Sequence, residues 1–97
     1  MIYTIEEIKA KSIPVAIEYG VKSMSIFGSY AKGNANDKSD IDFLIDAGNI
    51  TDLFELMAFI QDLEEILKCH VDVVTTGIDD EYFLSIIRKE EVLIYER

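Results

Sequence analysis

Residues 27–46 read FGSYAKGNANDKSDIDFLID, and this stretch decides the fold. It contains a Gly28-Ser29 turn, a polar loop over residues 34–39 and an alternating segment over residues 40–46. Side chains alternate between the two faces of a strand, so the last segment is predicted to be a strand with two different faces. One face carries Ile41, Phe43 and Ile45, and the other carries Asp40, Asp42 and Leu44.

The residues before this stretch predict a helix followed by a strand. Thr4 with Glu7 forms a capping-box pattern, which indicates a helix start. Pro14 interrupts helical hydrogen bonding, and Ser12 could cap a second segment, so we expect a kinked or two-piece helix ending at Gly20. Residues 22–27 alternate and predict a half-buried strand with Met24 and Ile26 on one face.

The residues after Phe27 predict the remaining elements. A helical turn over residues 30–32 ends at Gly33, and Thr51 and Asp52 open a long helix. Its apolar stripe, expected in the core, comprises Leu53, Leu56, Met57, Ile60, Leu63 and Leu67. A strand over 70–75 follows, in which His70, Asp72 and Val74 share one face. Asp79 or Asp80 caps a further helix with Phe83, Ile86 and Ile87, and residues 92–95 form a last strand.

This order of elements predicts the fold class. Helices and strands alternate along the chain, which is typical of an α/β (α+β) domain with a small mixed sheet. We expect one domain over residues 1–97, with helices backing one face of the sheet and a site on the other.

Composition limits the possible partners. The formal net charge is −10, so long DNA or RNA would be repelled. The acidic residues form either a solvated surface or, in part, a surface for a basic protein partner. No apolar run is long enough to cross a membrane, and we expect a cytoplasmic protein. The single cysteine, Cys69, argues against a zinc site and is expected to be a half-buried structural residue.

The aspartates have the chemistry of a metal site. Asp40 and Asp42 project from one strand face, and Mg²⁺ binds through one or two carboxylates together with water and substrate phosphate. Asp72 lies between apolar residues as though its strand were buried, so it should have a counter-ion. It could join a two-metal site or accept the proton of an attacking hydroxyl.

The turn and the aspartates also have ordinary explanations when each is taken alone. Gly28-Ser29 could be a simple turn, and Asp40 and Asp42 could be solvated acids at a strand entry. Free backbone N–H groups and a hydroxyl at the turn could instead receive a nucleotide phosphate. The combination of the turn, Lys32, and the three aspartates favours nucleotidyl transfer.

Two segments, FGSYAKG at 27–33 and SDIDFLI at 39–45, carry a family resemblance. Together they closely resemble the minimal nucleotidyltransferase group of the polymerase-beta-like superfamily. The resemblance extends from the helix before Gly20 to Tyr95 and implies that fold. It implies Asp40, Asp42 and Asp72 as catalytic metal ligands for Mg²⁺, with two ions, and ATP as substrate.

The resemblance also implies a partner and a phosphate site. Gly28, Ser29 and Lys32 would contact the nucleotide phosphates. The family usually has arginine where this chain has Lys32, and lysine neutralises charge without the planar fork of arginine. Members are commonly antitoxins that transfer AMP to a tyrosine of a HEPN-domain ribonuclease toxin. Larger relatives carry a further helical domain, so we expect a partner protein to complete the pocket.

Two other functions remain open from the sequence. The chain could mask its toxin by binding without catalysis, or it could transfer a nucleotide to a small hydroxylated molecule. Self-modification at Tyr30, Tyr82 or Tyr95 is a further option, although tyrosines at such positions usually pack in the structure. His70 shares the Asp72 face and could touch the site, but a structural role is expected for it.

Overall fold

The computed structural model describes residues 2–97, and it contains the predicted order of helices and strands. The elements are α1 (Ile5–Tyr19), β1 (Ser23–Phe27), α2 (Gly28–Lys32), β2 (Ile41–Asp46), α3 (Leu53–Leu67), β3 (Val71–Thr75), α4 (Glu81–Glu90) and β4 (Val92–Glu96). The predicted α/β fold class is confirmed. Among the described residues, no helix is long and apolar enough to cross a membrane.

The four strands form one mixed sheet in the order β3-β2-β1-β4. β1 pairs antiparallel with both β2 and β4, whereas β2 and β3 are parallel. A parallel pair needs a long crossover connection, and α3 supplies it. The register places Asp42 opposite Phe27 on one side and opposite Asp72 on the other. Positions 27, 42 and 72 therefore lie side by side across three strands.

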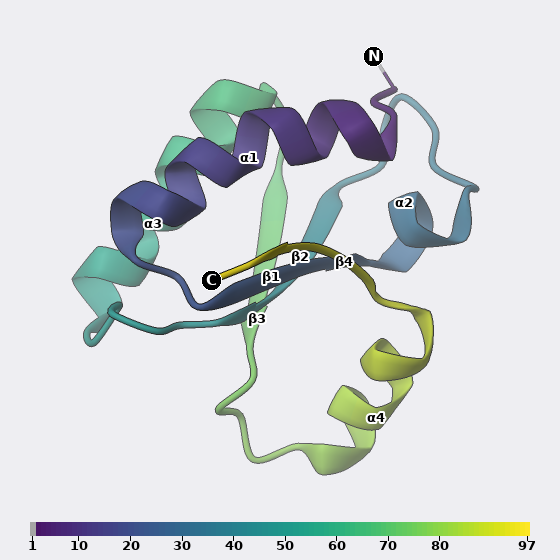
Figure 1. Ribbon diagram of the computed structural model, residues 1–97. Helices are drawn as coiled ribbons and strands as arrows, with labels where there is room; N and C mark the ends of the chain where they lie inside the picture. The colour runs from purple at the N-terminus through teal and green to yellow at the C-terminus, as the bar shows by residue number, and fades with distance from the viewer. Residues whose placement is uncertain (1) are drawn as a thin grey trace.

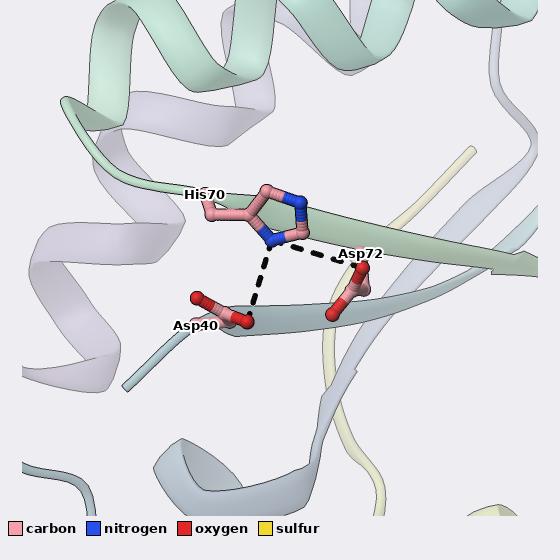
Figure 2. Close-up of side chains that lie close together, drawn as sticks. All are labelled: Asp40, His70 and Asp72. Carbon is pink, nitrogen blue, oxygen red and sulfur yellow. Dashed lines mark ion pairs between the residues drawn. The ribbon is translucent and has the colours of Figure 1, made fainter. Parts of the chain in front are cut away.

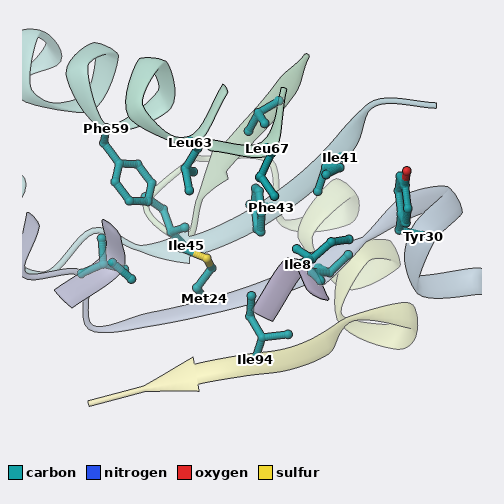
Figure 3. Close-up of a cluster of buried hydrophobic side chains, with 14 of the residues drawn as sticks. Ile8, Met24, Tyr30, Ile41, Phe43, Ile45, Phe59, Leu63, Leu67 and Ile94 are labelled. Atoms are coloured by element: carbon teal, nitrogen blue, oxygen red, sulfur yellow. The ribbon is translucent and has the colours of Figure 1, made fainter. Parts of the chain in front are cut away.

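The main core lies between the sheet and two helices. α1 and α3 lie over the same face of the sheet (Figure 1). From β2, Ile41, Phe43 and Ile45 are fully buried there, as the alternation predicted. Figure 3 shows these side chains meeting Phe59, Leu63 and Leu67 of α3. Close packing of these apolar side chains stabilises the domain and holds the strands of the sheet in place.

The opposite face is partly covered by α4, which corrects the expectation that helices back only one face. Figure 1 shows α4 on the side of the sheet away from α1 and α3. Ile87 packs there with Phe27 and Leu44 in a second, smaller buried cluster. Phe27 and Ser25 are therefore buried as well, and β1 is covered on both faces rather than half-buried.

α1 is a single helix across Pro14, so the two-piece alternative is wrong. Ser12 does not cap a second segment, because it is buried and its hydroxyl donates to the Ile8 carbonyl at 2.6 Å within the helix. Pro14 removes the hydrogen bond to the Ala10 carbonyl. Both residues are exposed, so water can satisfy that carbonyl without ending the helix.

The predicted helix ends are confirmed by their caps. The Thr4–Glu7 capping box is present, and Gly20 ends α1 with φ of 71°. Asp52 accepts the Glu55 N–H at the start of α3, and Asp80 accepts the Phe83 N–H at the start of α4. These caps are local to the chain, which explains why the sequence predicts them.

The apolar stripe of α3 is wider than its buried face. Leu63 and Leu67 are buried as predicted, but Leu53 and Met57 are 66% and 57% exposed. The prediction that the whole stripe lies in the core is therefore wrong for these two residues. The buried face instead includes Phe59, which the predicted stripe omitted. A helix contacts a neighbour along a limited arc, so the edges of a broad stripe remain outside.

Candidate active site

Two of the three predicted aspartates meet around the imidazole of His70. His70 Nδ1 lies 3.3 Å from Asp40 Oδ2 and 3.8 Å from Asp72 Oδ1. One ligand atom from each residue lies within 4.8 Å of the other two. Figure 2 shows the three side chains pointing toward one another, from the start of β2 and from β3. All three are exposed, so the group is open to a ligand from solvent.

Asp42 completes the acidic group. Its register partner across β2 and β3 is Asp72, so the two carboxylates project from neighbouring strands on the same face. Burial raises the pKa of Asp42 to about 6, and the charge of Asp72, a hydrogen bond with it, and the charges of Asp40 and Glu90 act in the same direction. The like charges repel one another, and a bound cation would relieve that repulsion.

Asp72 occupies a different environment from the predicted one. Its side chain is 53% exposed rather than buried, because β3 is an edge strand of the sheet. The expected counter-ion was not assigned from the sequence, and the nearby basic side chain is that of His70, whose Nδ1 lies 3.8 Å from Asp72 Oδ1. Asp42, on the inner strand β2, is the more buried carboxylate of the pair.

Gly28 lies directly against the Asp42 carboxylate. Its φ is +74°, a conformation that non-glycine residues rarely adopt. A Cβ at Gly28 would overlap Asp42 Oδ2. Position 28 therefore requires glycine both for its backbone angle and for the space beside the carboxylate. The half-buried Ser29 follows at the start of the short helix α2.

Lys32 and the Gly28 backbone share one anionic partner within the chain. Glu90, the last residue of α4, accepts the Gly28 N–H on Oε1 at 3.1 Å. Its other oxygen, Oε2, lies 3.3 Å from Lys32 Nζ. Gly28 and Lys32, two residues predicted to contact phosphate, therefore both contact one carboxylate.

Sequence reasoning missed Glu90, and it noted that His70 could touch the site while expecting a structural role for it. His70 precedes β3, and the alternation of the strand correctly indicated that it lies on the same face as Asp72. Nothing in the local pattern indicates Glu90, because it lies 62 positions after Gly28 and only the packing of α4 brings the two together.

The three tyrosines considered as acceptors and the single cysteine differ in how far they are buried. Tyr30 is buried and Tyr95 packs against the main core, as expected for structural tyrosines. Tyr82 is 78% exposed, so the expectation that it packs is wrong. Cys69 is half-buried, as predicted.

Comparisons with known sequences identify related chains. The family model of polymerase beta nucleotidyltransferases matches residues 10–97. A Methanocaldococcus jannaschii chain, provisionally named a protein adenylyltransferase, is 46% identical over 71 residues, which are 73% of this chain and 76% of the relative. The protein adenylyltransferase MntA of Thermococcus cleftensis is 35% identical over 75 residues, again 73% of this chain and 76% of the relative.

Solved structures share the fold. A toxin–antitoxin crystal structure with AMP-PNP aligns with a TM-score of 0.80 at 21% identity, over 92% of this chain and 73% of that one. The complex of tri-AMPylated Shewanella oneidensis HEPN toxin with MNT antitoxin aligns with a TM-score of 0.74 at 18% identity, over 95% of this chain and 72% of that one. At these identities the likeness shows the fold.

Proposed function

This chain belongs to the polymerase beta nucleotidyltransferase family, and from that premise we propose that it transfers AMP from ATP to a hydroxyl group of a protein partner. The observation that carries the proposal is that Asp42 lies beside both Gly28 and Asp72, while Asp72 also lies close to Asp40. Asp42 and Asp72 lie on β2 and β3, Asp40 directly precedes β2, and Gly28 begins α2 directly after β1. The pairing of the strands brings these positions to one surface.

The acidic group fits a divalent cation. Its carboxylate oxygens are the ligands that Mg²⁺ prefers. Burial and the neighbouring negative charges together raise the pKa of Asp42, and a cation would remove the part that comes from repulsion. We infer that Asp40, Asp42 and Asp72 would hold Mg²⁺, as a pair of ions. When bound, such ions polarise phosphate oxygens and stabilise the charge of the leaving group.

The residues of the chain would divide the remaining work. Gly28, Ser29 and Lys32 would bind the phosphates of ATP at the turn after β1. In the transfer step the acceptor oxygen attacks the α-phosphorus, the α–β phosphoanhydride bond breaks and pyrophosphate leaves. Asp72, exposed at the edge of the sheet, would take the proton of the attacking hydroxyl.

A protein acceptor fits both the openness of the site and the names of the relatives. The side chains of Asp40 and Asp72 are 49% and 53% exposed, so a large acceptor could reach them. The relatives are named protein adenylyltransferases, and one structural neighbour is held in complex with an AMPylated HEPN toxin. We therefore propose that this chain is an antitoxin acting on a tyrosine of a HEPN-type toxin, within a hetero-oligomer.

The test is a transfer assay with labelled ATP, Mg²⁺ and, as the candidate partner, the product of the gene adjacent to the one that encodes this chain. We expect the partner to be labelled, and Asp42→Asn to reduce labelling about a thousandfold, because metal-assisted charge stabilisation is worth several kcal/mol. Asp37→Asn, in an exposed loop, makes the same change in charge and should keep full activity.

Two results would count against this proposal. If the partner remained unlabelled with every nucleotide tested, transfer to that partner would be excluded. If Asp42→Asn neutralised the toxin as well as the unchanged protein, neutralisation would come from masking rather than catalysis.

A further inference from the structure

Glu90 contacts two groups that would serve a nucleotide phosphate. Its carboxylate accepts the Gly28 N–H at 3.1 Å and lies 3.3 Å from the Lys32 ammonium. A carboxylate and a phosphate each present anionic oxygens to N–H donors, so the two ligands compete for the same contacts. The side chain of Glu90 is 23% exposed and is the more buried partner of this ion pair.

We propose that Glu90 is an internal competitor of the nucleotide, which fills the anion site of Gly28 and Lys32 until a triphosphate displaces it. The nature of the ligand rests on the proposed function, since that function requires a nucleoside triphosphate at this turn. Glu90 therefore sets the affinity of the protein for its nucleotide without taking part in the transfer.

The surroundings make Glu90 a poor permanent occupant. It lies on the same side of the sheet as Asp42, and its charge is one of those that oppose ionisation of that carboxyl. Gly28 and Lys32 hold Glu90 toward the site, whereas the acidic group repels it. A triphosphate that arrives with a cation would replace Glu90, and the cation would neutralise the carboxylates of the acidic group.

Glu90 can leave the anion site without unfolding α4. It is the last residue of the helix, and its flexible side chain can rotate away at the cost of its two contacts. α4 itself is anchored by Ile87 in the smaller buried cluster. The neighbouring Glu91 accepts the Ser25 hydroxyl at 2.9 Å, which ties the helix end to β1 independently of Glu90.

The direct test compares Glu90→Gln with the unchanged protein. Glutamine keeps the size of the side chain but removes the anion. Calorimetry would measure binding of two probes, ATP and inorganic tripolyphosphate, with and without Mg²⁺. We expect Glu90→Gln to bind both probes about three- to tenfold more tightly, the range for losing a partly exposed charged competitor. Glu90→Ala should bind at least as tightly.

The matched control is Glu81→Gln, at the exposed N-terminal end of α4. It makes the same change in net charge and should leave both affinities unchanged. Circular dichroism would verify the fold of each variant. In the unchanged protein, the side-chain carboxyl carbon of Glu90 and the amide of Gly28 should shift together in NMR spectra as tripolyphosphate is added. This measurement does not depend on the folding of any variant.

The outcomes separate this inference from the proposed function. Unchanged or weaker binding by both Glu90 variants would overturn the inference, and so would a Glu90 signal that ignores tripolyphosphate. If the variants bound more tightly but no partner were labelled, the competitor role would stand and the proposed transfer would fall. If the partner were labelled but the Glu90 variants bound both probes with the affinity of the unchanged protein, the proposed transfer would stand and the competitor role of Glu90 would fall.

Discussion

The two faces of β2 differ although they alternate along six residues. Ile41, Phe43 and Ile45 have no exposed surface, and they pack beneath α1 and α3. On the other face, Leu44 is buried under α4, whereas Asp42 is only half-buried and lies beside Asp72. One face is filled by side chains, and the other combines a small apolar cluster with a group of like charges.

This difference shows that one face of the sheet stabilises the fold, whereas the other carries the residues of the candidate site. The filled face supplies most of the buried apolar area and fixes the strands in register. The other face can then hold carboxylates that repel one another, because packing of the main core offsets the unfavourable free energy of that repulsion. Because its carboxylates repel one another, the acidic group does little to stabilise the fold.

The largest expected contrast comes from shortening one apolar side chain on each face. Phe43→Ala should reduce the free energy of unfolding by about 3–5 kcal/mol, because Phe43 is fully buried in the main core. Ile87→Ala should cost about 2 kcal/mol, near the low end for such changes, because only three buried residues form its cluster. Urea unfolding measures both values.

Hydrogen exchange would sharpen that contrast. In Ile87→Ala, faster exchange should be confined to α4, whereas Phe43→Ala should affect the whole sheet. Equal costs for the two substitutions would show that the faces contribute alike.

A smaller loss of stability is expected when either of two glycines with similar backbone angles is replaced by alanine. Gly28 and Gly33 have φ of +74° and +77°, so alanine at either position should cost about 1–2 kcal/mol. Only at Gly28 would the new Cβ overlap the Asp42 carboxylate, because the space beside Gly33 is open to 4 Å.

Gly28→Ala should therefore abolish AMP transfer, while Gly33→Ala should lower thermal stability and keep the transfer. A transfer assay below both melting temperatures separates the two effects. Equal losses of activity would mean that backbone strain alone explains the need for Gly28.

The smallest expected effect is the pH dependence that Asp42 gives to the free energy of unfolding. Its pKa in the folded protein is about 6, above the usual 3.8, so the folded state holds the proton more tightly than the unfolded state does. The stability that this group contributes is therefore fully present below pH 4 and is lost as the pH rises toward 6 and above. Because Asp42 is partly exposed, we expect a loss of about 1 kcal/mol rather than the full value of the pKa difference.

Urea unfolding in the presence of a chelator, at several pH values from 4 to 7.5, would measure this loss. Asp42→Asn should be more stable than the unchanged protein at pH 7 and should lack this part of the pH dependence. Asp37→Asn controls for net charge. A pH profile of Asp42→Asn that matched the unchanged protein would contradict the role assigned to Asp42.

Local patterns predicted the elements and the candidate residues. The capping signals at Thr4, Asp52 and Asp80 involve residues only three positions apart, so they can be read from the sequence. The alternation over residues 40–46 correctly separated the buried face of β2 from the face with Asp42.

The errors arise where a residue depends on distant neighbours. Pro14 was expected to break α1, but its exposed position lets the helix continue. Asp72 was expected on a buried strand, because the apolar residues beside it do not reveal that β3 is an edge. Leu53 and Met57 belong to an apolar stripe whose buried arc is set by the packing of α3 against the rest of the fold.

By itself, the sequence determined the order of elements, the glycine turn and the identity of the acidic residues, because these follow from short-range spacing. The tertiary structure decided that Asp42 and Asp72 pair across parallel strands, that His70 lies between two carboxylates, and that α4 covers the second face. It alone brought Glu90 to Gly28 and Lys32. Contacts between residues far apart in the chain depend on how several elements pack together, and no local pattern records that packing.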